Sequence, residues 1–145
     1  DVTELSWRQL LEAYSCTECG RCTSVCPANL TGKKLSPRAV MMSIRDRAEE
    51  LGEFRRIHKD NSAQDGKNLF DYISREEIYA CTSCNACVEA CPVLINPLIP
   101  ILEMRRSDIL MNSKGPSDWL PMFNSLENNQ SVWSMSEARD AWKNH

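Results

Sequence analysis

Cys16–Pro27 reads CTECGRCTSVCP, and a second form of the same run, CTSCNACVEACP, occupies Cys81–Pro92. Each run places four cysteines at positions i, i+3, i+6 and i+10 and follows the last one with proline. All eight cysteines of the 145-residue chain lie in these two runs. The spacing C-x2-C-x2-C-x3-C-P is typical of [4Fe–4S] ligation. We therefore predict two [4Fe–4S] clusters, with the remaining chain folded around them.

The two runs belong to a longer internal repeat. A shift of 65 residues aligns Tyr14 with Tyr79, together with all the cysteines and both prolines of the runs. Each copy is entered by a predicted helix and followed, after a short loop, by another. The repeat predicts two pseudo-symmetric halves, each built as helix, cluster loop and helix.

The ligands of the two clusters are predicted to cross between the runs. Three closely spaced cysteines can wrap one cluster, and the proline after the fourth turns the chain away. In two-cluster ferredoxins the fourth cysteine of a run binds the other cluster. On this precedent, the first cluster is assigned to Cys16, Cys19, Cys22 and Cys91. The second cluster is assigned to Cys81, Cys84, Cys87 and Cys26.

Two residues between the ligands have a backbone role. Gly20 and Asn85 each follow the second cysteine of a run, and both residue types tolerate the left-handed conformation. Backbone of this kind can direct N–H groups toward sulfur. Such hydrogen bonds would raise the cluster potential.

Other uses of the cysteines fit the pattern less well. Disulfides need an oxidising compartment, and cysteines this clustered could hardly staple distant parts of a fold. Zinc signatures are normally built from C-x2-C pairs, whereas both runs here are triplets followed by Cys-Pro. The two histidines, His58 and His145, are interpreted as surface residues rather than ligands.

The hydrophobic pattern predicts an all-α fold, because no alternating strand pattern is found. Ser36 followed by Pro37 is a helix start, and Ser74 with Glu77 forms a capping box. Residues 57–68 are predicted to be a loop, and Lys114-Gly115-Pro116 to end a helix. Helices are predicted at residues 4–14, 36–54, 74–79, from 96 onward, 118–126 and 136–143.

Apolar side chains at helical spacing indicate which faces are buried. In the first helix, Leu5, Arg8, Leu11 and Ala13 alternate with polar positions, and Trp7, Leu10, Leu11 and Tyr14 repeat at three and four. The later stripes are Val40, Ile44, Ala48 and Leu51 in the second helix, and Leu98, Ile101, Leu102, Arg105 and Ile109 in the helix from 96 onward.

Length and charge narrow the class of protein. The length suits one domain with a real core, and no apolar run is long enough to span a bilayer. The acidic, amphipathic start, which is not a methionine, does not read as a signal peptide and is interpreted as that of an excised or processed chain. A net charge of −3 argues against nucleic-acid binding. Residues 33–59 are locally basic, either as a solvated helix face or as a docking surface for an acidic partner.

The separation of the runs by residues 27–80, with helices between them, resembles the α-helical ferredoxin group. That group includes a ferredoxin-like subunit of heterodisulfide reductase and the cluster domains of glycolate-oxidase-type iron–sulfur subunits. The resemblance covers about Leu5 to Ile109 and rests on the eight cysteines, Pro27, Pro92 and Glu103–Arg106. It implies an α-helical ferredoxin fold that carries two clusters within a larger iron–sulfur oxidoreductase.

The tail is similar to a linker found in longer members of that group. Asn128–Trp133, Arg139 and Trp142 resemble an Asn-Pro-Trp-Gly…Arg…Trp segment, with Val132 and Ser134 in place of Pro and Gly. In those members the linker precedes cysteine-rich CCG modules, and a membrane cytochrome-like segment often comes before the clusters. We predict a dicluster domain at residues 1–112 and a helical tail or linker at 113–145.

These observations predict an electron-transfer module. We find no Gly-rich phosphate loop, nucleophile–base pair or dinucleotide fingerprint, so no catalytic site is predicted in this chain. The expected partner is a redox protein or a neighbouring domain, CCG modules or a membrane cytochrome segment included. The expected location is the cytoplasm, at the membrane face if such a segment holds the chain there. The alternative is a partner-binding or regulatory protein whose clusters are structural or redox-sensing.

Overall fold

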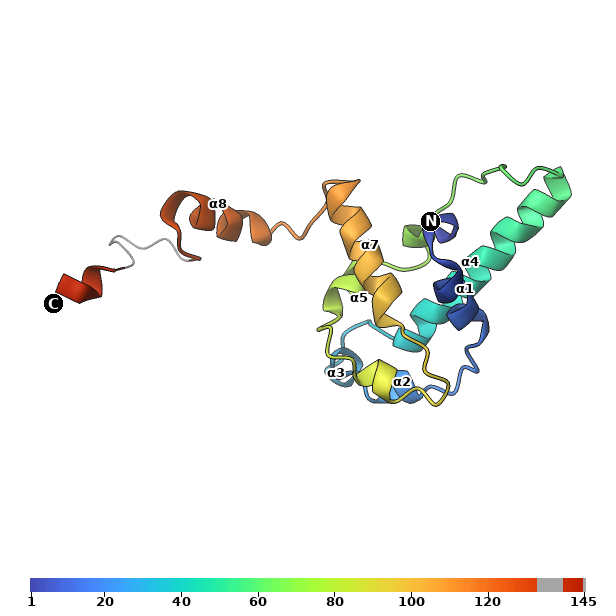
Figure 1. The fold of residues 1–145 in the computed structure, drawn as a ribbon, viewed down its shortest axis with the longest axis horizontal. Helices are drawn as coiled ribbons and strands as arrows, with labels where there is room; N and C mark the ends of the chain where they lie inside the picture. Colours follow the sequence, from blue (N-terminus) through green and yellow to red (C-terminus); the bar gives the residue numbers. More distant parts are fainter. Residues whose placement is uncertain (133–139, 145) are drawn as a thin grey trace. The chain divides into compact units, whose positions relative to one another are not determined.

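A computed structural model describes residues 1–132 and 140–144 of the chain (Figure 1). The described residues contain helices and no strand, which confirms the all-α prediction. The chain divides into two compact units, Asp1–Arg106 and Ser107–His145. Both cysteine runs lie in the first unit.

The helices of the first unit repeat in the way the sequence repeat predicts. Around the first run they are η1 (Val2–Glu4), α1 (Trp7–Tyr14), α2 (Arg21–Ser24), α3 (Pro27–Leu30) and α4 (Pro37–His58). Around the second run they are η2 (Leu69–Asp71), α5 (Arg75–Ala80), α6 (Ala86–Glu89) and α7 (Leu98–Leu110). Helices α2 and α6 occupy equivalent positions of the two runs, and they contact each other (Figure 1). The two cysteine runs are therefore side by side.

The predicted helix starts are confirmed. The Ser36 side chain accepts a hydrogen bond from the Ala39 N–H at the start of α4, with Pro37 at the first helical position. Ser74 and Glu77 form the reciprocal capping box of α5. Each cap satisfies N–H groups that the helix leaves without an internal partner.

Helix α4 is longer than predicted, since it continues past residue 54 to His58. It ends at Lys59, which adopts the left-handed conformation with φ 52°. His58 is exposed, as predicted, and its Nδ1 lies 2.8 Å from the Phe54 carbonyl oxygen.

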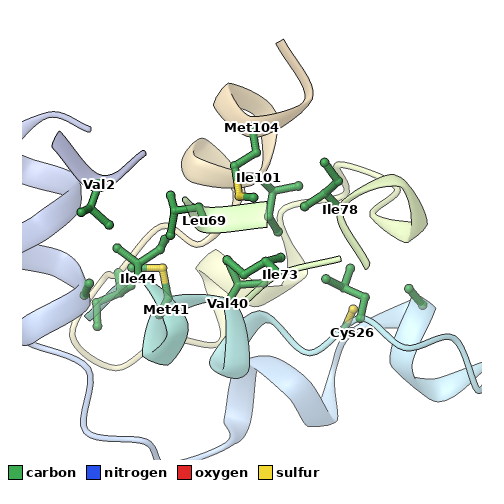
Figure 2. Packing of buried hydrophobic residues seen from close by; sticks show 14 of the residues in the cluster. Val2, Cys26, Val40, Met41, Ile44, Leu69, Ile73, Ile78, Ile101 and Met104 are labelled. Atoms are coloured by element: carbon green, nitrogen blue, oxygen red, sulfur yellow. The ribbon is translucent and has the colours of Figure 1, made fainter. Parts of the chain in front are cut away.

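The core of the first unit forms between α4, α7 and the segment that joins the halves (Figure 2). Val40 and Ile44 of α4 are almost completely buried, as the stripe on this helix predicts, and so is Met41, which the stripe did not include. Ile101 and Met104 of α7 belong to the same core. Leu102 and Ile109, which the predicted stripe of α7 also included, are exposed. The other buried members are Val2, Ala13, Cys26, Ala28, Leu35, Leu51, Leu69, Ile73, Ile78 and Ile95.

The prediction for the first helix was wrong in its start and in part of its buried face. The helix begins at Trp7, because Ser6 caps it and Gln9 completes the capping box. Ala13 is buried and Leu10 packs against the core, whereas Trp7, Leu11 and Tyr14 are exposed. Helix α1 packs against α4.

A buried arginine, Arg47, fastens the polar connection between the halves. Its side chain is 1% exposed and forms ion pairs with Asp65 at 2.6 Å and Asp1 at 2.8 Å. It also donates to the Lys67 carbonyl oxygen. A buried charge is tolerated when it is paired and hydrogen-bonded in this way.

The second unit contains the last turn of α7, followed by α8 (Trp119–Asn129) and η3 (Ala141–Asn144). Helix α8 confirms the helix predicted at 118–126 and extends three residues beyond it. The break at Lys114–Pro116 is confirmed, because no helix includes these residues. In the tail resemblance Trp133, Ser134 and Arg139 lie outside the described residues, as do residues 136–139 of the last predicted helix and His145.

Candidate iron–sulfur site

One pocket of the first unit brings cysteines of both runs together. Cys16, Cys19 and Cys22 line it, and so does Cys91 of the second run. Cys16 follows α1 and Cys22 lies in α2, whereas Cys91 follows α6. The apolar part of the wall is formed by Met41, Pro92, Val93, Ile95 and Pro97. Four thiols in a mainly apolar wall form a donor set suited to a metal cluster.

The remaining cysteines also approach one another across the runs. Cys87 is half-buried, and this burial raises the pKa of its thiol to about 11. The charges of Cys81, Cys22 and Cys26 add to the rise, in that order. Cys22 and Cys26 of the first run therefore both lie in the neighbourhood of Cys87. Cys26 is buried and Cys84 is exposed.

The loops that carry the ligands use left-handed backbone at equivalent positions. Gly20 and Asn85 have φ of 80° and 62°, which confirms the predicted conformation. Glu18 and Ser83, one residue before the second cysteine of each run, also have positive φ, at 57° and 56°. The sequence interpretation missed these two, because neither residue type favours this conformation as strongly as Gly or Asn.

Several N–H groups are directed at the cysteine sulfurs. The Ser83 N–H donates to Cys81 Sγ at 3.4 Å, and the Ile95 N–H donates to Cys91 Sγ at 3.3 Å. The pKa of Cys84 is lowered by hydrogen bonds from the Ala86 N–H and then from the Thr82 side chain. These donors stabilise negative charge on sulfur, which a thiolate ligand requires.

The chemistry of the donor set fits iron–sulfur clusters. All eight cysteines are free thiols. Burial is the largest cause of the raised pKa of both Cys22 and Cys87, and neighbouring cysteines raise both pKa values further. A bound cation would attract the thiolates and offset the repulsion between their negative charges. Among residues 1–132 and 140–144, no three His, Cys, Asp or Glu side chains converge as the ligands of a single ion.

Arginine side chains near the ligand loops form a pattern that the sequence interpretation missed. Arg45 pairs with Glu18 at 2.8 Å, and Arg105 donates to the carbonyl oxygens of Ile78 and Cys81. Each arginine follows the proline at the start of its helix, Pro37 or Pro97, by eight residues. This common offset from the proline is the sequence signal that could have identified the two arginines as equivalent. The 65-residue shift that aligns the cysteines does not align the arginines, because the loop after the second cysteine run is shorter.

The basic segment 33–59 is largely neutralised within the first unit. Lys34 pairs with Glu76, Arg56 with Glu53, and Arg45 and Arg47 with the carboxylates named above. Most of its excess charge is therefore already matched by carboxylates of the chain itself.

In the part of the chain that the structure describes, no helix combines the length and the apolar character needed to cross a bilayer.

Comparison with known proteins agrees with the geometry. The family model of the 4Fe-4S dicluster domain matches residues 15–95. The probable iron-sulfur-binding oxidoreductase FadF of Bacillus subtilis is 32% identical to 98% of this chain, which covers 24% of that protein. An EtfAB:quinone oxidoreductase of Syntrophomonas wolfei is 28% identical to 98% of the chain, which covers 23% of that protein.

A third relative carries the heterodisulfide reductase resemblance. It is a subunit of the ferredoxin:CoB-CoM heterodisulfide reductase of Methanosarcina mazei, 30% identical to 66% of the chain, with 46% of that subunit covered. No solved structure matches the chain. The chain spans about a quarter of the length of FadF and of the EtfAB:quinone oxidoreductase.

The match covers more than half of the chain and includes both cysteine runs. The eight cysteines fit two [4Fe–4S] clusters, as predicted. The chain belongs to the 4Fe-4S dicluster domain family.

Proposed function

We propose that this domain passes single electrons between redox partners of a larger iron–sulfur oxidoreductase. The observation that carries the proposal is the pocket shared by Cys91 and the triplet Cys16, Cys19 and Cys22. Bound [4Fe–4S] clusters supply one-electron redox chemistry, with potentials set by their charge, hydrogen bonds and exposure. The contact between α2 and α6 favours two clusters near enough for electrons to pass between them.

We propose that the ligands cross between the runs. The first cluster is bound by Cys16, Cys19, Cys22 and Cys91, a set supported by the composition of the pocket wall. The second cluster is then bound by Cys81, Cys84, Cys87 and Cys26. Cys81 and Cys26 both lie near enough to Cys87 to raise its pKa, as does Cys22 of the first cluster.

The protein's own groups prepare the site for electron transfer rather than for bond chemistry. The N–H groups of Ser83 and Ile95 stabilise charge on the sulfurs of Cys81 and Cys91. Cys19 and Cys84 lie at the exposed side, where a partner could approach. With eight cysteines serving as eight ligands, no open iron position is proposed for substrate.

We further propose that residues 1–112 form the cluster domain and that 113–145 form a tail or linker to the next part of the enzyme. The partner would be a redox protein or a neighbouring domain, and CCG modules or a membrane cytochrome segment are the candidates that the family resemblance implies. We place the domain in the cytoplasm or at the cytoplasmic face of the membrane, because its thiols must stay reduced to bind iron.

The test is anaerobic reconstitution followed by metal analysis and redox titration. We expect about eight irons and about eight sulfides per chain, with EPR signals that appear and disappear reversibly on reduction and oxidation. Two zinc ions without sulfide would refute the proposal.

A second candidate is a structural or redox-sensing role. The proximity of Cys91 to Cys16 favours it, because a cluster bound there would clamp distant parts of the chain. The titration distinguishes the roles: a relay shows reversible potentials and rapid electron exchange with a partner protein. A structural cluster would be redox-inert or would be lost on reduction.

A further inference from the structure

We propose that Arg38 and Arg105 are positioning residues that each supply the positive counter-charge of one cluster. Arg38 serves the first cluster and Arg105 serves the second. The proposal rests on the ligand assignment of the proposed function, and it adds the residues that set the two potentials.

Arg38 is one of two charged residues that line the pocket with Cys16 and Cys91; the other is Glu18. The Glu18 carboxylate is paired with Arg45 at 2.8 Å, so this pair contributes little net charge. Arg38 is half-buried and, in the part of the chain that the structure describes, has no carboxylate within ion-pair distance. The charge that remains in the pocket wall is therefore positive.

The position of Arg38 in its helix strengthens this argument. It lies in the first turn of α4, where the helix dipole favours acidic side chains and disfavours cations. Its N–H donates to Thr23 Oγ1 at 3.4 Å, and the Thr23 hydroxyl also bonds to Ser36. Thr23 is next to the ligand Cys22, so this network holds the start of α4 against the cluster loop. A negative cluster in the pocket would compensate the unfavourable placement of the cation.

In the second half, the arginine beside the ligand loop comes from a different position of the following helix. Leu98, the residue that follows Pro97 as Arg38 follows Pro37, is buried and uncharged. Arg105 instead donates from Nε to the Ile78 carbonyl at 2.8 Å, and from Nη2 to the carbonyls of Ile78 and Cys81. Ser83 takes the place of Glu18 in this half, and among the described residues no carboxylate forms an ion pair with Arg105. Among the described residues, each half therefore has one arginine of its following helix, α4 or α7, without an acidic partner beside its ligand loop. Arg21, within the first loop, also lacks an ion pair to any residue that the structure describes, but it is exposed.

A cation near a cluster stabilises the reduced form, because reduction adds one negative charge.

The test is an EPR-monitored redox titration of the reconstituted full chain, with Arg38→Gln and Arg105→Gln variants. Glutamine at 105 retains an N–H donor for the Ile78 carbonyl but lacks the charge. Cys91→Ser and Cys26→Ser variants assign each signal to its cluster.

We expect Arg38→Gln to lower the potential of the first cluster alone and Arg105→Gln to lower that of the second alone. The expected size is on the order of tenfold in the reduction equilibrium, which is about 59 mV for one electron. The Lys variants at both positions should stay close to the wild-type potentials. Arg106→Gln is the matched control, because Arg106 neighbours Arg105, is largely exposed and pairs with Glu103, and it should shift neither potential.

Unchanged potentials in both Gln variants, or a shift confined to the wrong cluster, would overturn the proposal. If a Gln variant loses its cluster, the Lys variant decides: retention with Lys supports the counter-charge, and loss with both substitutions overturns it. Failure of the relay proposal looks different, because the wild-type chain itself would then lack reversible clusters.

Discussion

Cys91, the last cysteine of the second run, lines the same pocket as Cys16, the first cysteine of the first run. The pocket is therefore shared between the two halves of the repeat, because its wall contains cysteines from both. The contact of α2 with α6 brings these segments together. This sharing can be tested with single substitutions.

Cys91→Ser should disable the first cluster and spare the second. Serine removes one soft thiolate ligand, so we expect iron and sulfide to fall from about eight to about four of each per chain. The remaining EPR signal should belong to the cluster held by Cys81, Cys84 and Cys87. Cys26→Ser is the reciprocal variant and should spare the first cluster. Loss of only the second cluster in Cys91→Ser would contradict the crossed assignment.

Removal of iron should largely unfold the first unit. The clusters are proposed to join segments that are distant in sequence, so their binding free energy also stabilises the fold. We expect an iron chelator, under anaerobic conditions, to reduce the far-UV circular dichroism and to abolish a cooperative thermal transition. Reconstitution with iron and sulfide should restore both. An apo chain that keeps its helicity and a sharp transition would argue against this coupling.

Gly20→Ala should destabilise the holo protein, and Gly20→Asn should do so less. The backbone at Gly20 has φ of 80°, and an added Cβ would meet no atom within 4 Å. The cost is therefore conformational rather than steric crowding by neighbours, about 1 to 2 kcal/mol for an alanine forced into this region. Asparagine already occupies the equivalent position 85 with φ of 62°. The measurement is the thermal unfolding midpoint of the reconstituted variants, and equal midpoints for Ala and wild type would refute the prediction.

Asp65→Asn should make the fold less sensitive to acid. The hydrogen bond from Arg47 lowers the pKa of Asp65 from its usual 3.8 to about 2. A carboxyl with a lowered pKa stabilises the folded state above its unfolded pKa, and this contribution is lost as the pH falls through the folded pKa. In the wild-type chain, the contribution of Asp65 should therefore be lost between about pH 4 and pH 2. Acid also removes the clusters, equally in wild type and variant, so the quantity to compare is the difference in stability between the two proteins at each pH.

The Asp65→Asn variant should be less stable than wild type at neutral pH, and its free energy of unfolding should fall less between about pH 4 and pH 2. Chemical denaturation at a series of pH values checks both statements. Asp60→Asn is the matched control, since Asp60 is an exposed carboxylate whose pKa is lowered by Ser62 and not by a buried arginine. An Asp65→Asn profile parallel to the wild type would contradict the prediction.

The sequence predicted the features that depend only on neighbouring residues, namely the cysteine spacing, the helix starts and the left-handed positions. The cysteine spacing predicted the family and its cofactors, and Ser36-Pro37 and Ser74 through Glu77 predicted where α4 and α5 begin. Gly20 and Asn85 were recognisable because few other residues tolerate positive φ. These features depend on residues close together in the chain, so a one-dimensional pattern contains them.

Side-chain placement that depends on distant segments was not predictable. The buried face of α1 was predicted only in part, because packing against α4 buries Ala13 and leaves Trp7 and Leu11 exposed. The buried Arg47 needs Asp1 and Asp65 to compensate its charge, and no local pattern reveals partners so far apart.

The cysteine runs illustrate both what the sequence predicts and what requires the tertiary structure. By itself, the sequence predicted eight cysteines as the iron ligands, because thiolate ligands at this spacing have few other uses. Only the tertiary structure decided which cysteines share a wall, and which arginines lie beside them without a carboxylate. The physical reason is that ligand identity is a property of residue type and spacing, whereas proximity and charge compensation arise from the packing of helices far apart in the chain.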